Sequence, residues 1–203
     1  MPPHPASART MIELGIVVGS TRPRRIGPVV ADWLRNEVPP DTFAVTVLDL
    51  AEIGLPLLDE PELAATGIYT HEHTRHWSRL VGSVDALVLV TPEYNNGYPA
   101  AVKNAIDYLY AEWADKPVAV FGYGYRGAAS CREQLATVLR RVHARVVDGV
   151  GLRLRDHLVG EPGAAAAVRP DAELLGATRR MLDALAQAVI AGTDADEDIR
   201  PTV

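Results

Sequence analysis

Two prolines enclose a short stretch of aromatic and amide side chains in the middle of the chain. The stretch between Pro92 and Pro99 reads Glu-Tyr-Asn-Asn-Gly-Tyr, and it directly follows the apolar run 86–90. Such a run is typical of a buried strand, and residues 100–113 after the loop have helical spacing. A loop between a strand and a helix lies at the carboxyl end of a sheet, where open α/β folds bind ligands. A stiff loop of tyrosine and asparagine suits a flat ring that is held by backbone groups and by stacking.

A second distinctive turn follows the first apolar run of the chain. It combines glycines, hydroxyl side chains and arginines: Gly19, Ser20, Thr21, Arg22, Arg24, Arg25 and Gly27. A helix is expected to start directly after this turn, and a helix N-terminus offers unpaired N–H groups that favour a phosphate. The planar guanidinium of arginine also pairs well with phosphate oxygens. The alternative is a solvated basic turn in which Ser20 or Thr21 caps the helix. ATP or GTP hydrolysis has no support, because the turn lacks the Gly-Lys-[Ser/Thr] of a Walker A motif.

Residues 122–127 form a third turn, with the spacing G-x-G-x-x-G that dinucleotide-binding Rossmann domains use. In those domains the pattern lies on the first strand–helix turn, whereas here it follows the fourth predicted strand. We therefore interpret it as another turn at the same sheet edge, with Tyr123 and Tyr125 facing the same crevice. The simpler alternative is that the glycines only permit a tight strand-to-helix turn.

Other residues capable of chemistry lack the patterns of known sites. His71, His73 and His76 look like part of a zincin motif, but H-E-x-x-H requires a histidine where the chain has Arg75. His71 and His73 are also expected to point in different directions on a helix. The single cysteine, Cys131, has no histidine beside it in the pattern, and no G-x-S-x-G motif is present. We predict no metal site, and no catalytic acid, base or nucleophile supplied by a side chain.

Strands and helices alternate between these turns. Apolar runs and alternation predict strands at residues 12–18, 43–50, 86–90, 118–121 and 145–147, and helical spacing predicts helices at residues 28–38, 70–81, 100–113, 127–142 and 171–190. This alternation predicts a parallel sheet covered on both faces. Five strands fit a flavodoxin-like α/β fold, a three-layer sandwich with strand order 2-1-3-4-5, better than a six-stranded dinucleotide-binding fold.

Composition and chain ends narrow the class of protein. A length of 203 residues predicts one domain, and a net charge of −6 gives no overall attraction to nucleic acid or to an anionic membrane. One cysteine excludes an internal disulfide and fits a cytoplasmic location. No signal peptide is visible, and no apolar stretch is long enough to span a membrane. We expect residues 1–11 to be a disordered tail, residues 12–191 to be the domain, and residues 192–203 to be a flexible tail.

The three turns together resemble those of the NADPH-dependent FMN reductase family, a flavodoxin-like group that includes quinone, azo-dye and chromate reductases. The resemblance rests on residues 19–27, on Pro92-Glu93-Tyr94-Asn95 with the later Lys103-Asn104-Ala105-Ile106-Asp107, and on residues 124–127. It spans residues 12–190 and implies an FMN-binding domain. In such proteins the first turn holds the FMN phosphate, the central turn holds the isoalloxazine ring, and the third turn closes over the ring or the ribityl chain. The corresponding cofactor-binding residues are Gly19, Ser20, Arg22 and Arg25, then Pro92, Glu93, Tyr94 and Asn95, then Gly124 and Gly127, while Asn96, Tyr98 and Tyr125 are expected on the substrate side.

The resemblance implies an FMN-dependent NAD(P)H oxidoreductase. NADPH or NADH would pass a hydride to the flavin, and a small acceptor such as a flavin, a quinone or an azo compound would then take the electrons. Backbone N–H groups of the central loop would stabilise the reduced flavin anion. The alternative is an FMN-binding electron carrier or sensor that does not use nicotinamide. A third hypothesis, a Rossmann dehydrogenase that uses nicotinamide alone, depends on the glycine pattern at residues 122–127. In this family the helix after the central loop often contributes to a dimer interface, so a homodimer or tetramer is expected.

Overall fold

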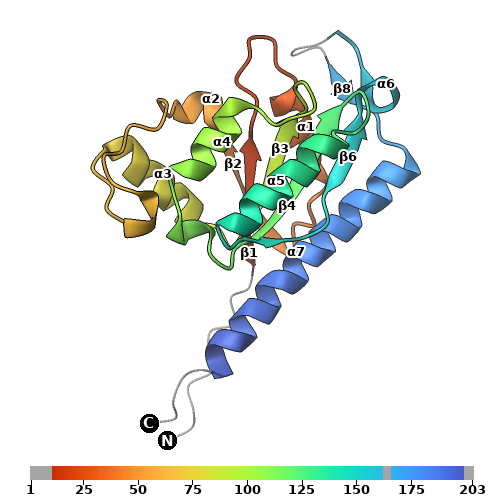
Figure 1. Ribbon diagram of the computed structural model, residues 1–203. Coiled ribbons are helices and arrows are strands. Elements are labelled where there is room, and N and C mark those ends of the chain that lie inside the picture. Colours follow the sequence, from red (N-terminus) through yellow and green to blue (C-terminus); the bar gives the residue numbers. More distant parts are fainter. Residues whose placement is uncertain (1–10, 162–165, 199–203) are drawn as a thin grey trace, which may run out of the picture.

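A parallel sheet forms the centre of the molecule. In the computed structural model, which describes residues 11–161 and 166–198, the first four strands lie in the order β2-β1-β3-β4 (Figure 1). They are β1 (Ile12–Val18), β2 (Phe43–Asp49), β3 (Ala86–Pro92) and β4 (Pro117–Gly124). Two short strands, β5 (Arg145–Val146) and β6 (Val150–Arg153), both pair with β4 in parallel and share the fifth position. The predicted order 2-1-3-4-5 is therefore confirmed, with the fifth position divided between two strands.

The division of the fifth position has a local cause. At Gly149, between β5 and β6, the chain passes so close to β4 that a Cβ atom would lie 2.2 Å from the carbonyl oxygen of Val120. The Val147 N–H still donates to the carbonyl oxygen of Val118 at 3.0 Å, but residues 148–149 bulge past β4, and pairing resumes at Val150 opposite Phe121.

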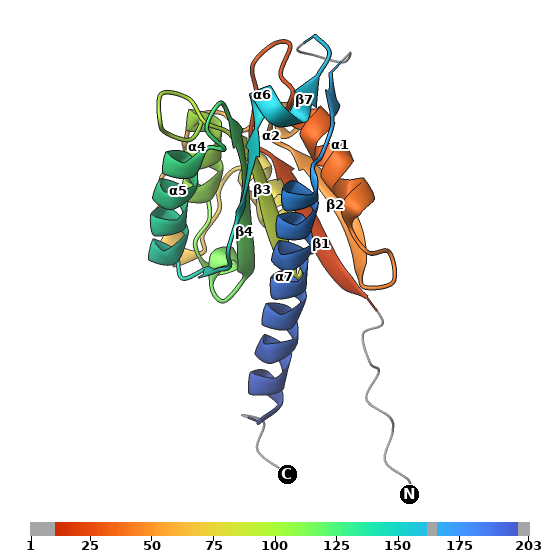
Figure 2. The ribbon, with the colours of Figure 1, turned by 90° about the vertical axis from the view of Figure 1, so that its right-hand side faces the viewer.

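Helices cover both faces of this sheet (Figure 2). One face packs against α1 (Gly27–Glu37) and α7 (Ala172–Asp198), and the other packs against α3 (Glu72–Gly82), α4 (Ala100–Asp107) and α5 (Ala129–Arg141). Every residue of β3 and β4 is buried, because both faces of the central strands are covered. This burial explains why those strands are continuous apolar runs, and it gives the three-layer sandwich that the alternation predicts.

The remaining elements are short. They are α2 (Leu50–Ile53), the 3₁₀ turns Ala64–Thr66 and Ala111–Trp113, α6 (Leu154–His157), and the antiparallel pair β7 (Leu158–Val159) and β8 (Ala167–Val168). No periodic pattern predicts them, because each has four residues or fewer. None of the helices in the described part of the chain could cross a membrane.

Two helix ends differ from the prediction. The helix after the central loop ends at Asp107, and Trp113 belongs to a separate 3₁₀ turn. The closing helix continues to Asp198, past the predicted end at residue 190 and into the predicted C-terminal tail. Residues 1–10 and 199–203 of the predicted tails lie outside the described residues.

The strand register aligns the three turns that carry the distinctive residues. Val18 near the end of β1 is opposite Val90 of β3, and Val90 is opposite Phe121 of β4. Adjacent parallel strands therefore end at the same edge, and the segments that follow them meet there.

Candidate functional site

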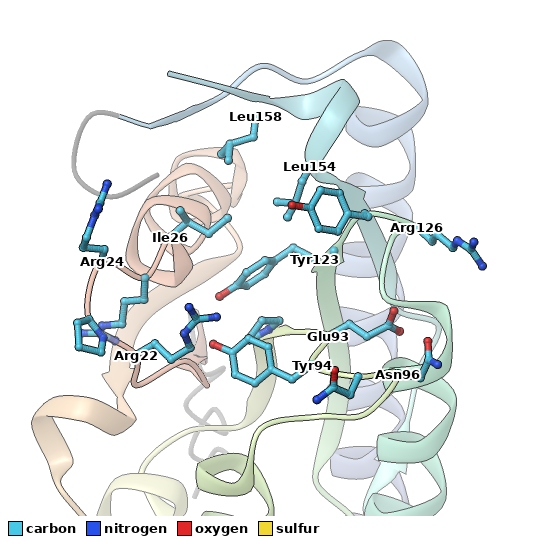
Figure 3. A pocket seen from close by; sticks show the side chains of 16 residues that line it. Arg22, Arg24, Ile26, Glu93, Tyr94, Asn96, Tyr123, Arg126, Leu154 and Leu158 are labelled. Carbon is cyan, nitrogen blue, oxygen red and sulfur yellow. The ribbon is translucent and has the colours of Figure 1, made fainter. Parts of the chain in front are cut away.

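A cavity of about 760 Å³ opens at this edge of the sheet (Figure 3). Residues 22–26 line it from the turn after β1, residues 92–96 from the turn after β3, and residues 123–126 from the turn after β4. Leu154 and Leu158, at α6 and β7, complete the wall, and they lie across the cavity from Tyr94 and Asn96. This volume is within the range of sites for cofactor-sized molecules.

The first turn contains a buried hydroxyl without a regular hydrogen bond among the described residues. Ser20 is 1% exposed, and its Oγ has no hydrogen bond of regular geometry among the described residues, although its interaction with the neighbouring Tyr123 hydroxyl acts to lower the pKa of that phenol. A Cβ atom at Gly27 would lie 2.2 Å from this Oγ and 3.1 Å from the hydroxyl oxygen of Tyr123. A buried hydroxyl without a regular hydrogen bond is costly, so a further polar group bound at this turn would stabilise it. Glycine at position 27 keeps the space beside the hydroxyl open.

The N-terminus of α1 faces the same turn and is not capped. Ile26 occupies the cap position and offers no side-chain hydrogen bond. Pro28 has no N–H, and Val30 donates to the carbonyl oxygen of Ile26. The N–H groups of Gly27 and Val29 therefore remain available among the described residues, together with the positive end of the helix dipole. Arg22 is exposed, and its guanidinium lies over the Tyr94 ring at 5.6 Å from the ring centre. These groups form a cradle for an anion between the first and the central turn.

Arg25 has a different place from the one that the sequence suggests. Its Nη1 and Nη2 donate to the two carboxylate oxygens of Asp49 at 2.6 and 2.7 Å, and Nη1 also donates to the carbonyl oxygen of Ser20 at 2.8 Å. The hydrogen bond to Asp49 raises the pKa of the Arg25 guanidinium above its usual value. The end of β2 thus holds Arg25, and Arg25 in turn holds the backbone of the first turn. If Arg25 also contacted a phosphate, its guanidinium would be shared between that phosphate and Asp49.

The central loop contains a tight two-residue turn between Tyr94 and Gly97. The backbones of Tyr94 and Gly97 exchange two hydrogen bonds, of 2.8 and 2.9 Å, and both central residues, Asn95 and Asn96, have positive φ angles of 51° and 65°. These are features of a type I′ turn, for which asparagine is among the preferred residues. The two consecutive asparagines therefore have a backbone reason for their positions. They are exposed and line the cavity.

Neighbouring elements fix this turn from two sides. The Glu93 N–H donates to the carbonyl oxygen of Tyr123 on β4 at 3.0 Å, while the Glu93 carboxylate accepts from the Cys131 N–H at the start of α5. The side chain of Gln134 on α5 donates to the carbonyl oxygen of Asn96 at 2.9 Å. Glu93 therefore caps α5 as well as lining the cavity.

The third turn contributes two tyrosines of opposite character. Tyr123 is 3% exposed, and burial raises the pKa of its phenol. Tyr125 is 73% exposed, and the guanidinium of Arg155 lies over its ring at 5.6 Å from the ring centre. Gly127 has φ of +73°, which favours glycine, and a Cβ there would lie 3.5 Å from the backbone of Gly151.

Most of the predicted site residues come together at the cavity. The following line it: Arg22, Arg25, Pro92, Glu93, Tyr94, Asn95, Asn96, Gly124 and Tyr125. Gly19 and Ser20 lie beneath the first turn, where a Cβ at Gly19 would lie 2.5 Å from Val102 of α4. Gly127 lies behind the third turn. Tyr98, expected on the substrate side, does not line the cavity; it is half-buried and packs against the apolar core on the face covered by α3, α4 and α5.

Sequence reasoning missed the upper wall of the cavity. Ile26, Leu154 and Leu158 form its apolar part, and Arg24 and Arg126 stand at its edges. Leu154 and Leu158 are four residues apart, but α6 has only four residues, so no helical period marks them.

In the structure, His71 and His73 hold the loop around Asp59 in place. His71 lies at the cap position before α3 and not within the helix, and its ring stacks on that of His73 with centres 5.1 Å apart, so the expectation that the two point in different directions is wrong. Both rings contact Asp59: His73 Nε2 lies 2.9 Å from Oδ1 and His71 Nε2 lies 3.3 Å from the carbonyl oxygen. Cys131 is fully buried, and burial raises the pKa of its thiol to about 11.

Comparison with known proteins identifies the family. The sequence pattern of the NADPH-dependent FMN reductases matches residues 12–155. The chain belongs to this family. It is 40% identical over 155 residues to the NAD(P)H-dependent FMN reductase LOT6 of Saccharomyces cerevisiae, covering 70% of this chain and 81% of that protein. It is 32% identical over 155 residues to an NADPH azoreductase of a Bacillus species, covering 72% and 82%.

Solved structures agree on the fold of this FMN reductase family member. The flavoenzyme NAD(P)H:(acceptor) oxidoreductase FerB of Paracoccus denitrificans superposes with a TM-score of 0.68 at 20% identity, over 89% of this chain and 98% of that one. Family membership makes the chain an FMN-dependent NAD(P)H oxidoreductase. The predicted family, fold, activity class and cofactors are thereby confirmed, and the electron-carrier alternative is not favoured.

Proposed function

We propose that this FMN reductase holds FMN in the 760 Å³ cavity and reduces a small aromatic acceptor at its open side. The observation that carries the proposal is the buried Ser20 hydroxyl, which has no hydrogen bond of regular geometry among the described residues and lies beside Gly27 below an uncapped helix N-terminus. This arrangement is an incomplete anion site, and the phosphate of FMN would complete it. FMN, when bound, supplies the hydride acceptor and donor that the side chains lack.

The residues of the cavity fit this cofactor. Ser20, Arg22 and the first N–H groups of α1 would bind the phosphate, and Arg25 would hold their backbone in position through Asp49. Tyr94 and the asparagine turn would lie along the ring. The polar phosphate end and the apolar wall formed by Leu154 and Leu158 match the two ends of a flavin nucleotide.

Backbone N–H groups offer a way to stabilise negative charge on the ring. In the central turn, the N–H groups of Glu93, Tyr94 and Gly97 already have backbone partners. The N–H groups of Asn95 and Asn96 have none among the described residues. Fixed donors of this kind stabilise charge without reorganisation during the reaction. Because Gln134 and the turn geometry hold both residues, we expect these two amides to supply the stabilisation that the sequence assigns to the loop.

The identity of the electron acceptor is less well defined than that of the electron donor, NAD(P)H. The curated relatives include an azoreductase, a 2-hydroxy-1,4-benzoquinone reductase and quinone reductases, so small aromatic acceptors are the proposed class. Tyr125 and the apolar wall give such a molecule a surface to stack on. The role of Asn96 and Tyr125 on the substrate side is part of this proposal.

A spectrum and one anaerobic titration test the function. We expect the purified protein to be yellow and to bleach when NADPH is added without oxygen, and a quinone to restore the colour. A yellow protein that neither NADPH nor NADH reduces would support the electron carrier instead. A colourless protein that FMN cannot reconstitute would refute both.

The phosphate assignment has a test of its own. Arg22→Ala should weaken FMN binding by about tenfold at low salt, and by less in 0.5 M salt, because salt screens an exposed charge. Arg35→Ala, on the outer face of α1, is the matched control and should leave affinity unchanged. Equal affinities of wild type and Arg22→Ala at every salt concentration would remove Arg22 from the site.

We further propose that two copies associate through the segment before α3. Leu57, Leu58, Leu63 and Ile68 are 82%, 49%, 78% and 60% exposed. The segment is held firmly on α4, where the Asn104 side chain donates to the carbonyl oxygen of Pro56 at 2.7 Å and accepts from the Leu58 N–H at 2.9 Å. Ordered apolar side chains on a surface are typical of an interface, and this one adjoins the helix expected to form a dimer.

Light scattering after gel filtration tests this association. We expect the mass of a dimer for the wild type and that of a monomer for the double variant Leu57→Ser/Leu63→Ser. Val159→Ser, at a 42% exposed position elsewhere, is the control. A wild-type monomer at all concentrations would refute the proposal. The cytoplasmic location also remains a proposal, based on the single cysteine, and cell fractionation tests it.

A further inference from the structure

A second cavity, of about 220 Å³, lies behind the turn after β4. It shares a wall with the flavin cavity: Leu154 and Leu158 line the flavin cavity, whereas their neighbours Arg153 and His157 line the second one. Arg126 lines both. Figure 3 shows that its side chain points away from the flavin cavity. The two spaces therefore meet at Arg126.

Two arginines in this second cavity have donors to spare. Arg126 is exposed and has no ion pair or hydrogen bond among the described residues. Arg132 on α5 donates from Nη1 to the carbonyl oxygen of Gly149 at 2.9 Å, but its Nε is buried and has no partner in the described part of the chain. A buried guanidinium N–H without an acceptor is costly. An anion bound here would satisfy it.

The other charged residues of the cavity are already paired. Arg153 contacts Asp156 at 2.6 Å and Glu173 at 3.5 Å. His157 accepts from the Arg153 N–H at Nδ1, and its Nε2 lies 3.1 Å from Asp171. Glu173, the acidic residue in the lining, is 75% exposed at its side chain and lies toward Arg153. The unsatisfied charge of the cavity is therefore positive and belongs to Arg126 and Arg132.

Glycines form much of the remaining wall. Gly127, Gly149 and Gly151 all line the cavity, and a Cβ at Gly151 would lie 2.4 Å from the carbonyl oxygen of Gly127. The close approach of the two backbone segments explains the glycine at position 151. It also leaves the space between the arginines free of bulky side chains.

We infer that this second cavity binds the 2′-phosphate of NADPH, with the nicotinamide end of the same molecule in the flavin cavity. The inference rests on the proposed function and adds to it a preference for NADPH over NADH, which differ by this phosphate alone. Two guanidinium groups match a phosphate that carries close to two negative charges. Arg126 stands where the two cavities meet, so a single extended nucleotide can reach both.

Stopped-flow reduction of the FMN-loaded enzyme tests the preference. The second-order rate constants for NADPH and NADH are measured without oxygen in wild type, Arg126→Gln and Arg132→Gln. We expect NADPH to be favoured in the wild type, and each variant to lower the NADPH-to-NADH ratio by about tenfold or more, as for loss of a charge-assisted hydrogen bond. Arg140→Gln, at an exposed position on the same helix α5, should retain the wild-type ratio. A wild-type ratio near one, or variants that keep the wild-type ratio, would overturn the inference while leaving the proposed function intact.

A binding measurement separates this site from flavin chemistry. Calorimetric titration of wild-type protein with adenosine 2′,5′-bisphosphate and with adenosine 5′-monophosphate should show tighter binding of the bisphosphate. Arg126→Gln should remove the difference. This result is independent of flavin reduction, so it stands even if the protein does not turn over NADPH. Equal binding of the two nucleotides, or a difference that survives in Arg126→Gln and Arg132→Gln, would overturn the inference.

Discussion

The ion pair between Arg25 and Asp49 gives the most decisive prediction about how the first turn works. Asp49 engages Arg25 with two hydrogen bonds, so we propose that Arg25 positions the phosphate turn and leaves the phosphate to other donors. A double-mutant cycle of Arg25→Gln and Asp49→Asn separates these roles, because removing both charges also removes the cost of leaving one unpaired.

The expected magnitude follows from the geometry. The side chains of Arg25 and Asp49 are only 19% and 10% exposed, so solvent screens the pair weakly. At a charge separation of about 4 Å and an effective dielectric constant of about 20, the Coulomb attraction is about 4 kcal/mol. Desolvation cancels part of this attraction. We therefore expect a coupling free energy of about 2 kcal/mol in the free energy of unfolding, measured by urea denaturation.

The same variants test flavin binding. Arg25→Gln leaves the Asp49 carboxylate unpaired beside the phosphate site, so the dissociation constant of FMN, measured by fluorescence titration, should rise about tenfold. The double variant should recover most of this loss. If Arg25 contacted the phosphate directly, the double variant would bind FMN as weakly as Arg25→Gln alone, and the positioning role would be refuted.

The exposed pair of Arg35 and Asp32 on α1 is the matched control. Its side chains are 52% and 61% exposed, and its contact distance of 2.6 Å equals that of the Arg25 pair. The corresponding cycle, Arg35→Gln with Asp32→Asn, should give a coupling below about 0.5 kcal/mol and no change in FMN affinity. A coupling free energy as large as that of the Arg25–Asp49 pair would show that burial does not explain the strength of the Arg25–Asp49 interaction.

Three further predictions follow from the site. Gly27→Ala would place a methyl group 2.2 Å from Ser20 Oγ and displace that hydroxyl, so FMN affinity by fluorescence titration should fall at least about tenfold; an unchanged affinity would contradict the cradle. Asn96→Val should lower the free energy of unfolding by about 1–2 kcal/mol and Asn96→Gly should not, because φ at this position is 65°; equal stabilities in urea would contradict the turn assignment. Burial raises the pKa of the Cys131 thiol from 9.0 to about 11, so the folded protein keeps a proton that the unfolded chain releases, and stability should fall as the pH rises from 9 to 11. The variant Cys131→Ala should lose less of its free energy of unfolding over this pH range. If the wild type and the variant lose stability in parallel, the prediction is contradicted.

The alternation of strands and helices and the three distinctive turns are determined by the sequence alone. Burial on one or both faces imposes a period on each element, so the sequence specifies β1 and β2 almost to the residue. It locates β3 and β4 but ends both too early, because Thr91 and the glycines at 122 and 124 interrupt the apolar runs. Strand order follows from that alternation, and it brings the turns together at one edge. The type I′ turn is also a local property, because two adjacent asparagines tolerate positive φ.

The tertiary structure alone decided which side chains share the site. Arg25 looks like a phosphate ligand in sequence, but strand pairing places Asp49, 24 residues away, within reach of its guanidinium. Leu154 and Leu158 enter the wall from α6 and β7, which are too short to show a period, and Tyr98 does not line the wall but packs, partly buried, against the core. Local sequence encodes which face of an element is buried. The partner that a side chain meets depends on the register and packing of distant segments, which no local pattern contains.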